Sequence, residues 1–121
     1  MNTQGAPKTC LVVDDEPAIL RLVALVLRDL GCDTLVAPDA ESALNVVDNE
    51  HPDVIISDVK LPGMDGVEFA RKIKSDGHDK TPVLLMSAFG EPRNHSGDAF
   101  LAKPFDIDGL VDFVSPYLET V

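Results

Sequence analysis

The stretch Leu11-Val12-Val13-Asp14-Asp15 is a short apolar run that ends on two carboxylates. Three further runs follow the same plan, each ending on a residue able to take part in chemistry: VIISD (54–58), VLLMS (83–87) and AFLAK (99–103). Short apolar runs between helical stretches are typical of buried parallel strands. Ligands of open α/β sheets bind beyond the carboxyl ends of the strands. The sequence therefore predicts one pocket holding three carboxylates, a hydroxyl and an ammonium group.

Amphipathic stretches alternate with these runs. Pro17 stands at the favoured early position of the first helix, Gly31 stops that helix, and Asp39 is placed to cap the next. The expected strands cover residues 9–13, 34–37, 54–57, 83–86 and 100–102, and the expected helices lie near 16–30, 39–50, 65–75 and 106–116. This alternation predicts an α/β fold, in which helices cover both faces of a parallel sheet.

Size, charge and hydropathy restrict the class of protein. A chain of 121 residues suits one domain, and we expect residues 1–8 to be a flexible leader before a domain at 9–121. The net charge of −11 repels phosphate backbones, so direct binding to nucleic acid is not expected. The longest apolar stretch, residues 22–27, is too short to span a bilayer, and no secretory signal is visible. Cys10 and Cys32 are expected to be buried thiols in a reducing compartment, which predicts a cytoplasmic protein.

Over residues 9–118 the chain resembles the receiver domain of two-component response regulators, the CheY-like group. The resemblance rests on motifs in a fixed order: Asp14-Asp15, Asp58, the loop Pro62-Gly63-Met64-Asp65-Gly66, Ser87 and Lys103-Pro104-Phe105. It implies a doubly wound five-stranded parallel sheet of order 2-1-3-4-5, as in flavodoxin and CheY.

The resemblance also implies a role for each site residue. Asp58 is the expected phosphoacceptor, and a phosphohistidine on a histidine kinase or phosphotransfer protein is the expected donor. Ser87 and Lys103 would each contact a phosphoryl oxygen. The ligands of Mg²⁺ would be Asp14, Asp15, Asp58 and the backbone carbonyl of Lys60, and no other cofactor is expected. Ser87 and Phe100 would form a switch, and the Lys103-Pro104 peptide would be cis.

The charges alone lead to similar chemistry. Three close carboxylates repel one another, so they need a cation or must bind protons. Mg²⁺ prefers a few carboxylates and retained waters, which suits this set. Together, Mg²⁺ and Lys103 would cancel the three negative charges, so that a phosphoryl group could approach a carboxylate nucleophile.

The chain departs from the family between the fourth and fifth strands. Lys103 follows Ser87 by 16 positions, which is shorter than the family norm by roughly one and a half helical turns. Residues 88–98 contain two glycines and a proline and have no helical apolar repeat. We therefore expect the fourth helix of the family to be reduced to a loop or stub, which leaves the usual output surface in doubt.

The leading hypothesis is a response regulator receiver that signals to an unknown downstream protein by phosphorylation-dependent contacts. It would carry out its own phosphorylation chemistry without being a turnover enzyme. One alternative is a phosphatase or phosphotransferase with an aspartyl-phosphate intermediate, although no separate general base is evident. The other alternative is an interaction module that works without phosphorylation.

Overall fold

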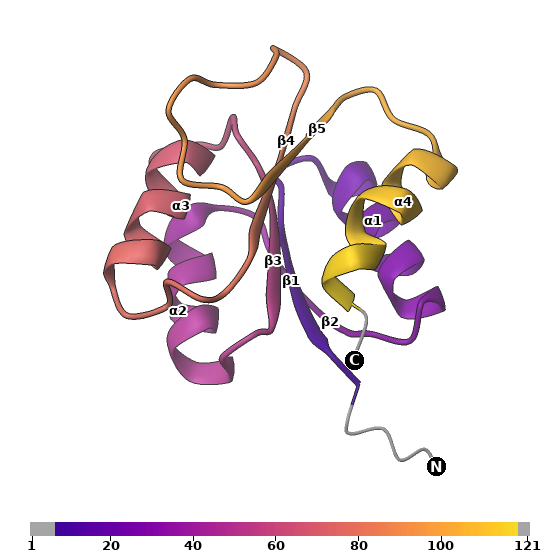
Figure 1. Ribbon diagram of the computed structural model, residues 1–121, viewed down its shortest axis with the longest axis horizontal. Helices are drawn as coiled ribbons and strands as arrows, with labels where there is room; N and C mark the ends of the chain where they lie inside the picture. The colour runs from indigo at the N-terminus through magenta and orange to yellow at the C-terminus, as the bar shows by residue number, and fades with distance from the viewer. Residues whose placement is uncertain (1–6, 119–121) are drawn as a thin grey trace.

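The computed structural model describes residues 7–118 and shows an α/β fold. Its elements, in chain order, are β1 (Thr9–Val13), α1 (Pro17–Asp29), β2 (Asp33–Ala37), α2 (Ala40–Glu50), β3 (Val54–Asp58), α3 (Gly66–Ser75), β4 (Val83–Ser87), β5 (Ala99–Ala102) and α4 (Ile107–Leu118). The five strands form one parallel sheet of order β2-β1-β3-β4-β5, which confirms the predicted order. Helices α1 and α4 cover one face of the sheet, and α2 and α3 cover the other (Figure 1).

The central strands are buried on both faces. Every residue of β3 and of β4 is buried, as expected for parallel strands between two helical layers. The register pairs Val13 with Ser57, Asp58 with Met86, and Ser87 with Ala102. The carboxyl ends of β1, β3, β4 and β5 therefore lie side by side along one edge of the sheet.

The local signals for helix starts act as the sequence predicts. The side chain of Asp39 accepts a hydrogen bond from the backbone N–H of Ser42 (2.7 Å), which caps α2. Asp65 caps α3 in the same way, through the N–H of Glu68 (2.8 Å). Helix α1 begins at Pro17, whose missing N–H costs nothing in the first turn. These caps set where each helix begins relative to the strand before it.

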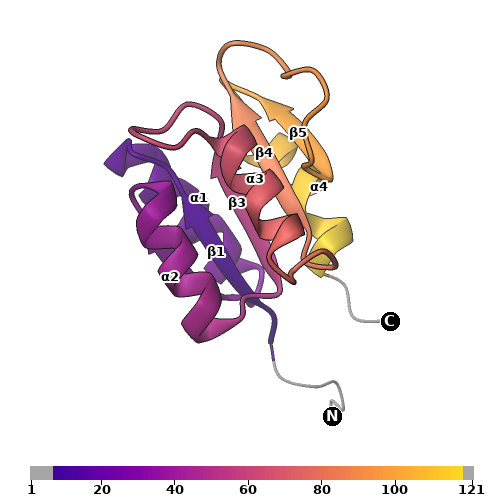
Figure 2. The same ribbon diagram turned by 90° about the vertical axis from the view of Figure 1, so that its left-hand side faces the viewer.

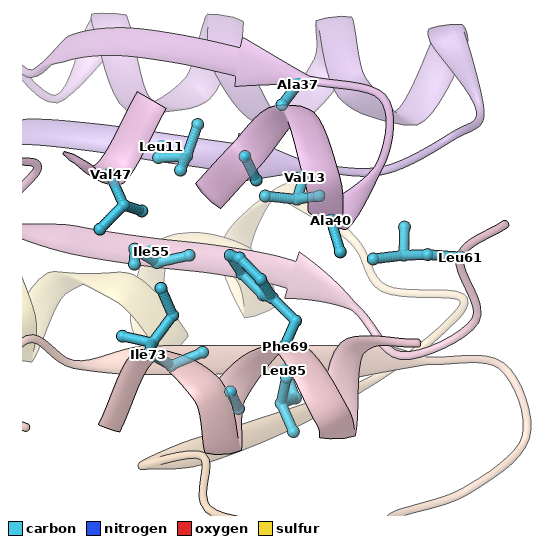
Figure 3. Packing of buried hydrophobic residues seen from close by; sticks show 13 residues of the cluster. Leu11, Val13, Ala37, Ala40, Val47, Ile55, Leu61, Phe69, Ile73 and Leu85 are labelled. Carbon is cyan, nitrogen blue, oxygen red and sulfur yellow. The ribbon is translucent and has the colours of Figure 1, made fainter. Parts of the chain in front are cut away.

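The core consists of two apolar layers, one on each face of the sheet. In the layer under α2 and α3, the ring of Phe69 reaches from α3 toward Ile55 of β3 (Figure 3). Phe69 and Ile55 are fully buried. Burying a side chain of this size stabilises the fold by about 1.5–3 kcal/mol. The two layers hold the strand ends, and the polar residues that follow them, in fixed positions.

The prediction that the fourth helix is reduced to a loop or stub is wrong for this chain. Its fourth helix, α4, is a full helix of 12 residues. It follows β5, where the sequence predicts the last helix. The segment that joins β4 to β5, residues 88–98, contains neither helix nor strand, and it forms the broad orange arch of Figures 1 and 2.

Polar contacts hold the arch at its β5 end. The carboxylate of Asp98 accepts hydrogen bonds from the N–H of Val83 (2.7 Å) and from Lys74 Nζ (2.8 Å). Lys74 also donates to the carbonyl of Thr81 (2.8 Å). Within the arch, His95 contacts Glu91 through Nε2 (2.8 Å), while its Nδ1 accepts the N–H of Gly97 (3.0 Å). The connection is thus tied to α3 and to the start of β4.

Residues 1–6 of the predicted leader lie outside the described residues, and the carbonyl of Lys8 already accepts the N–H of Asp33 (3.0 Å). Cys10 and Cys32 are buried free thiols. Burial raises the pKa of both thiols above their ordinary value. Within residues 7–118, no helix is long and apolar enough to cross a membrane.

Candidate functional site

A pocket of about 230 Å³ opens at the carboxyl edge of the sheet. Its lining comes from the last residue of β3 and from the loops that follow β1, β3, β4 and β5: Asp15, Glu16, Asp58, Lys60, Ala88, Phe89 and Lys103. These segments are far apart in the sequence and meet because parallel strands all end at the same edge. The pocket is where the strand-end pattern predicts it.

Three carboxylates gather at this pocket. Asp14 and Asp15 follow β1, and Asp58 is the last residue of β3. One oxygen from each carboxylate lies within 4.8 Å of the others. Asp14 is fully buried, Asp58 is 6% exposed and Asp15 is exposed. The cluster therefore combines one solvent-exposed carboxylate, Asp15, with two buried carboxylates, Asp14 and Asp58.

Lys103 is the cation among these carboxylates. Its Nζ lies 2.9 Å from Asp14 Oδ2, 3.4 Å from Asp58 Oδ2 and 3.7 Å from Glu16 Oε1. The Lys103 side chain is 10% exposed, so water screens these charges less than at an open surface. The Lys103-Pro104 peptide is cis.

The pKa values reflect this mixture of burial and charge. Burial raises the pKa of Asp58 above its ordinary value, Lys103 acts in the opposite direction, and the charge of Asp14 adds to the rise. Burial acts to lower the pKa of Lys103. The hydrogen bond and charge of Asp14, together with the charge of Asp58, outweigh that effect and raise it. Lys103 is therefore firmly protonated, whereas Asp58 holds its negative charge at a cost.

Both oxygens of Asp14 already have partners, because Oδ1 accepts the N–H of Glu16 (2.9 Å) and Oδ2 accepts Lys103 Nζ (2.9 Å). Asp15 makes no ion pair within the described chain and opens into the pocket. Oxygen ligands of this kind suit a hard divalent cation such as Mg²⁺. The donor set thus fits the expected metal, with Asp15 the carboxylate most available to hold it.

The other predicted residues lie at varying distances from the pocket centre. Lys60 lines the pocket, and its Nζ lies 5.1 Å from the centroid of the Phe89 ring. Ser87 is buried at the end of β4, where its Oγ accepts the N–H of Phe89 (3.0 Å), and it does not line the pocket. Phe100 lies on β5, half-buried against the core under α2 and α3. The structure thus gathers the acids, Lys60 and Lys103, while Ser87 and Phe100 do not line the pocket.

Sequence reasoning missed one charged residue of the pocket, Glu16. Its carboxylate lies 3.7 Å from Lys103 Nζ, and its backbone N–H fixes Asp14. Its place directly after Asp14-Asp15 was a usable signal, but the helix start at Pro17 explained an acidic residue there equally well.

Gly66 connects the fold to this site. It begins α3, and its N–H donates to the carbonyl of Val59 (2.7 Å). A Cβ at position 66 would lie 2.8 Å from Val59 Cα and would overlap the backbone carbonyl oxygen of Asp58 even more severely. Only glycine lets α3 approach the end of β3 this closely.

We expect Gly66→Ala to destabilise the protein by about 1–3 kcal/mol, because backbone must move to admit the methyl group. Urea unfolding would measure this loss. Gly109→Ala is the matched control, since its added Cβ would meet only the side chain of Asp106, and its effect should stay within about 1 kcal/mol. Equal stability of the two variants would show that α3 can shift away from β3 without penalty.

Comparison with known proteins agrees with this geometry. Residues 10–115 match the family model described as "Response regulator receiver domain". The chain is 36% identical over 114 residues to sporulation initiation phosphotransferase F of Bacillus subtilis, an alignment that covers 89% of this chain and 91% of that protein. It is also 36% identical over 114 residues to the transcriptional regulatory protein TrcR of Mycobacterium tuberculosis, covering 88% of this chain and 44% of TrcR.

The chain spans about half the length of several such curated relatives. Among solved structures, the chemotaxis response regulator CheY4 of Vibrio cholerae superposes with a TM-score of 0.84 at 30% identity, covering 93% of this chain and 99% of that one. Fold, strand-end acids and family model all agree, and the chain belongs to the response regulator receiver domain family.

Proposed function

We propose that this domain accepts a phosphoryl group on Asp58 from a histidine kinase or phosphotransfer protein. It would then signal through protein contacts that depend on the phosphorylated state. The observation that carries the proposal is the cluster of Asp14, Asp15 and Asp58 at an open pocket, where Lys103 Nζ pairs with Asp14 and Asp58. Receiver domains act in two-component signalling, and acceptance of a phosphoryl group by this cluster agrees with that role.

Asp58 supplies the nucleophile. One of its carboxylate oxygens would attack the phosphorus of a phosphohistidine, forming a P–O bond as the P–N bond breaks. The electron pair of the P–N bond would remain on the imidazole nitrogen of the donor. Burial favours the reaction, because a carboxylate that is poorly solvated loses little hydration when it reacts.

Lys103 and the acidic pair control the charge at the pocket. Asp14, Asp15 and Asp58 carry three negative charges, and Lys103 supplies one positive charge. Asp15, Asp58 and the carbonyl of Lys60 would hold Mg²⁺, with Asp14 behind them. When bound, Mg²⁺ would supply the remaining two positive charges and stabilise charge on the phosphoryl oxygens. Lys103, 3.4 Å from Asp58 Oδ2, is placed to pair with a phosphoryl oxygen on Asp58.

The readout would differ from the usual pattern of the family. The helix-free connection 88–98 begins at Ala88 and Phe89, which line the pocket, and ends at Asp98. The N–H of Phe89 binds the Ser87 hydroxyl. If Ser87 turned toward a phosphoryl group, it would release this hydrogen bond and loosen the start of the connection. The resulting change near 88–98 is the proposed signal to a downstream protein, with Phe100 of β5 as the neighbouring switch candidate.

Incubating the protein with acetyl phosphate and Mg²⁺ tests the proposal, with intact-mass spectrometry and phosphate release as readouts. A receiver should gain one phosphoryl group per chain and release phosphate only slowly. Continuous release of phosphate would instead indicate a phosphatase, and the absence of any mass gain would indicate a module that works without phosphorylation. We propose the first outcome, for a cytoplasmic protein that is not a turnover enzyme.

Lys60 and Phe89 are expected to prolong the life of the phosphorylated form. Both side chains line the pocket and form a cation–π pair, which would limit the access of water to a phosphoryl group on Asp58. Neither side chain offers a carboxylate or amide to orient an attacking water. Lys60→Asn and Phe89→Glu should each speed the decay of the phosphoprotein, by about tenfold or more for the carboxylate of the second variant.

The decay rate of labelled protein after removal of the donor measures this effect. Lys72→Asn, on the exposed face of α3, is the control and should decay like the parent. If Lys60→Asn and Phe89→Glu also decay at the parental rate, these side chains do not govern the lifetime.

A further inference from the structure

A second hollow lies at the amino edge of the sheet, opposite the phosphorylation pocket. Its volume is about 490 Å³, and its lining includes Lys8, Asp53 and Pro82, which directly precede β1, β3 and β4. None of the residues that line this hollow lines the pocket around Asp58. The proposed function therefore leaves the hollow without a task.

Two histidines of this hollow lie close together. His51 ends α2 as its C-cap, and His78 comes shortly after the end of α3. Their ring centroids are 6.3 Å apart. The chain has three histidines, and two of them meet here because α2 and α3 both end at the lower side of the molecule, away from the arch (Figures 1 and 2). Imidazole is the commonest metal ligand among side chains, so a pair this close is a candidate metal site.

A carboxylate lies next to this pair. Asp48, in the last turn of α2, places its Oδ1 atom 3.8 Å from Nε2 of His78. Two ligand atoms on a tetrahedral Zn²⁺ ion are roughly 3.4 Å apart, given metal–ligand distances of about 2.0–2.1 Å. The carboxylate and the imidazole thus need to approach each other only slightly to share one ion.

The third ligand, His51, has further to move. Two imidazoles on one tetrahedral ion have ring centroids roughly 5 Å apart, about 1 Å less than the observed separation. His51 and Asp48 are both exposed, so their side chains have room to turn toward the less exposed His78. Among the described residues, only the acidic cluster already gathers three ligand atoms within 4.8 Å of one another. A metal ion would therefore draw the second set together as it binds.

The electrostatic environment favours a cation in this place. The carboxyl ends of α2 and α3 carry partial negative charge, and the net charge of −11 attracts cations to the chain as a whole. Phosphate is the competing occupant, because Lys8 and Lys80 also line the hollow. The carboxylates of Asp53, in the lining, and of Asp48, beside His78, oppose such an anion.

We propose that Asp48, His51 and His78 bind a divalent transition-metal ion of the Zn²⁺ class, with a water molecule completing the tetrahedron on the side of the hollow. One nitrogen of each imidazole and one carboxylate oxygen hold the ion. Nitrogen ligands favour such ions over Mg²⁺, which prefers oxygen ligands. The bound ion ties the end of α2 to the end of α3, and this role is independent of phosphorylation.

Titration of the full chain with Zn²⁺, followed by calorimetry and by amide chemical shifts, tests the proposal. The acidic cluster around Asp58 also offers ligands to Zn²⁺, so the Asp15→Ala variant serves as a background in which that pocket is weakened. In this background we expect one ion per chain, with shifts at the ends of α2 and α3. Adding either His51→Gln or His78→Gln should weaken the zinc affinity by at least about tenfold, because even groups behind metal ligands contribute that much.

Adding His95→Gln to the same background is the matched control. It also removes an imidazole that contacts a carboxylate, that of Glu91 (2.8 Å), but it does so in the arch. Its zinc affinity should equal that of Asp15→Ala alone. Zinc should raise the unfolding temperature of this control and leave that of the His78→Gln variant unchanged, since only a folded state that binds the ion is stabilised. Equal circular dichroism without zinc would exclude misfolding as the cause of any difference.

Equal zinc affinity of the His78→Gln and His95→Gln variants would overturn the proposal. So would an undiminished affinity of His51→Gln, shifts confined to other elements, or the absence of zinc binding in the Asp15→Ala background. Inorganic phosphate is the probe for the competing occupant. Shifts around the hollow on adding phosphate, lost in Lys8→Ala/Lys80→Ala and found without any effect of zinc, would assign the hollow to an anion.

Discussion

Replacing Asp58 by Asn is expected to abolish phosphoryl labelling while leaving the protein folded. The substitution replaces the nucleophilic carboxylate by a neutral amide, which cannot form the acyl phosphate, yet it keeps the size and polarity of the side chain at the end of β3. Asp14 is buried and already engaged through both oxygens, so it cannot replace Asp58 as nucleophile. Labelling by acetyl phosphate, followed by intact-mass spectrometry, should show no gain in mass.

The same variant should be more stable than the parent at neutral pH when Mg²⁺ is removed by a chelator. The raised pKa of Asp58 means that the folded protein binds its proton more tightly than the unfolded chain does. The stability linked to this proton is fully present below the pKa of the unfolded chain, near 3.9, and is lost as the pH rises through the raised pKa. At neutral pH the parent bears the full cost of the ionised carboxylate, which the amide of asparagine avoids.

Urea unfolding at several pH values measures this difference, and Asp33→Asn, an exposed position on β2, is the control for labelling and stability. The stability gain of Asp58→Asn over the parent should shrink as the pH falls. Persistent labelling of Asp58→Asn at the parental level would assign the phosphoacceptor to another residue.

The sequence could predict the position of the site because residues that are adjacent in the chain mark the end of each strand. An apolar run followed by Asp14-Asp15, Asp58 or Lys103 needs no tertiary information to be recognised, and parallel order then brings all of these residues to one edge. The same logic places the helix starts at Pro17, Asp39 and Asp65, since caps act within one turn.

The pairing of charges could not be predicted in the same way. Lys103 lies 89 positions after Asp14, and nothing local indicates that its Nζ binds Asp14 more closely than Asp58. The contact depends on the direction in which the chain leaves β5 and on the length of one flexible side chain. Ser87 shows the same limit, because its hydroxyl at the end of β4 is taken by the N–H of Phe89 instead of facing the pocket.

The sequence could predict that the arch between β4 and β5 has no helix, but it could not predict the path that the arch follows. Glycine and proline in residues 88–98 argue against a helix, and the structure has none there. The fixed points of the arch come from Asp98, which binds Lys74 and the start of β4. These contacts join residues that are 15 and 24 positions apart, and they follow no periodic pattern. The contact between α1 and β2 has the same origin, since Leu25 and Val36 come together only through the packing of these two elements.

Removing the metal is expected to have an effect as large as removing the nucleophile. Asp15→Ala should lose both Mg²⁺ binding and labelling, because it takes away the carboxylate that is exposed to the pocket and free of ion pairs with other described residues. Lys103 alone cannot neutralise the acidic cluster, so a phosphoryl donor would meet a net negative pocket. Excess chelator should reduce labelling of the parent to the same background.

Calorimetric titration with Mg²⁺ and labelling by acetyl phosphate separate the two effects. Asp33→Ala changes charge by the same amount at an exposed position away from the pocket, so it should bind Mg²⁺ and label like the parent. Since Asp15 is exposed, its replacement should change the free energy of unfolding by less than about 0.5 kcal/mol, which excludes misfolding as the cause of any loss. Full labelling of the parent in chelator would show that Lys103 suffices and that the acidic pair serves only to position it.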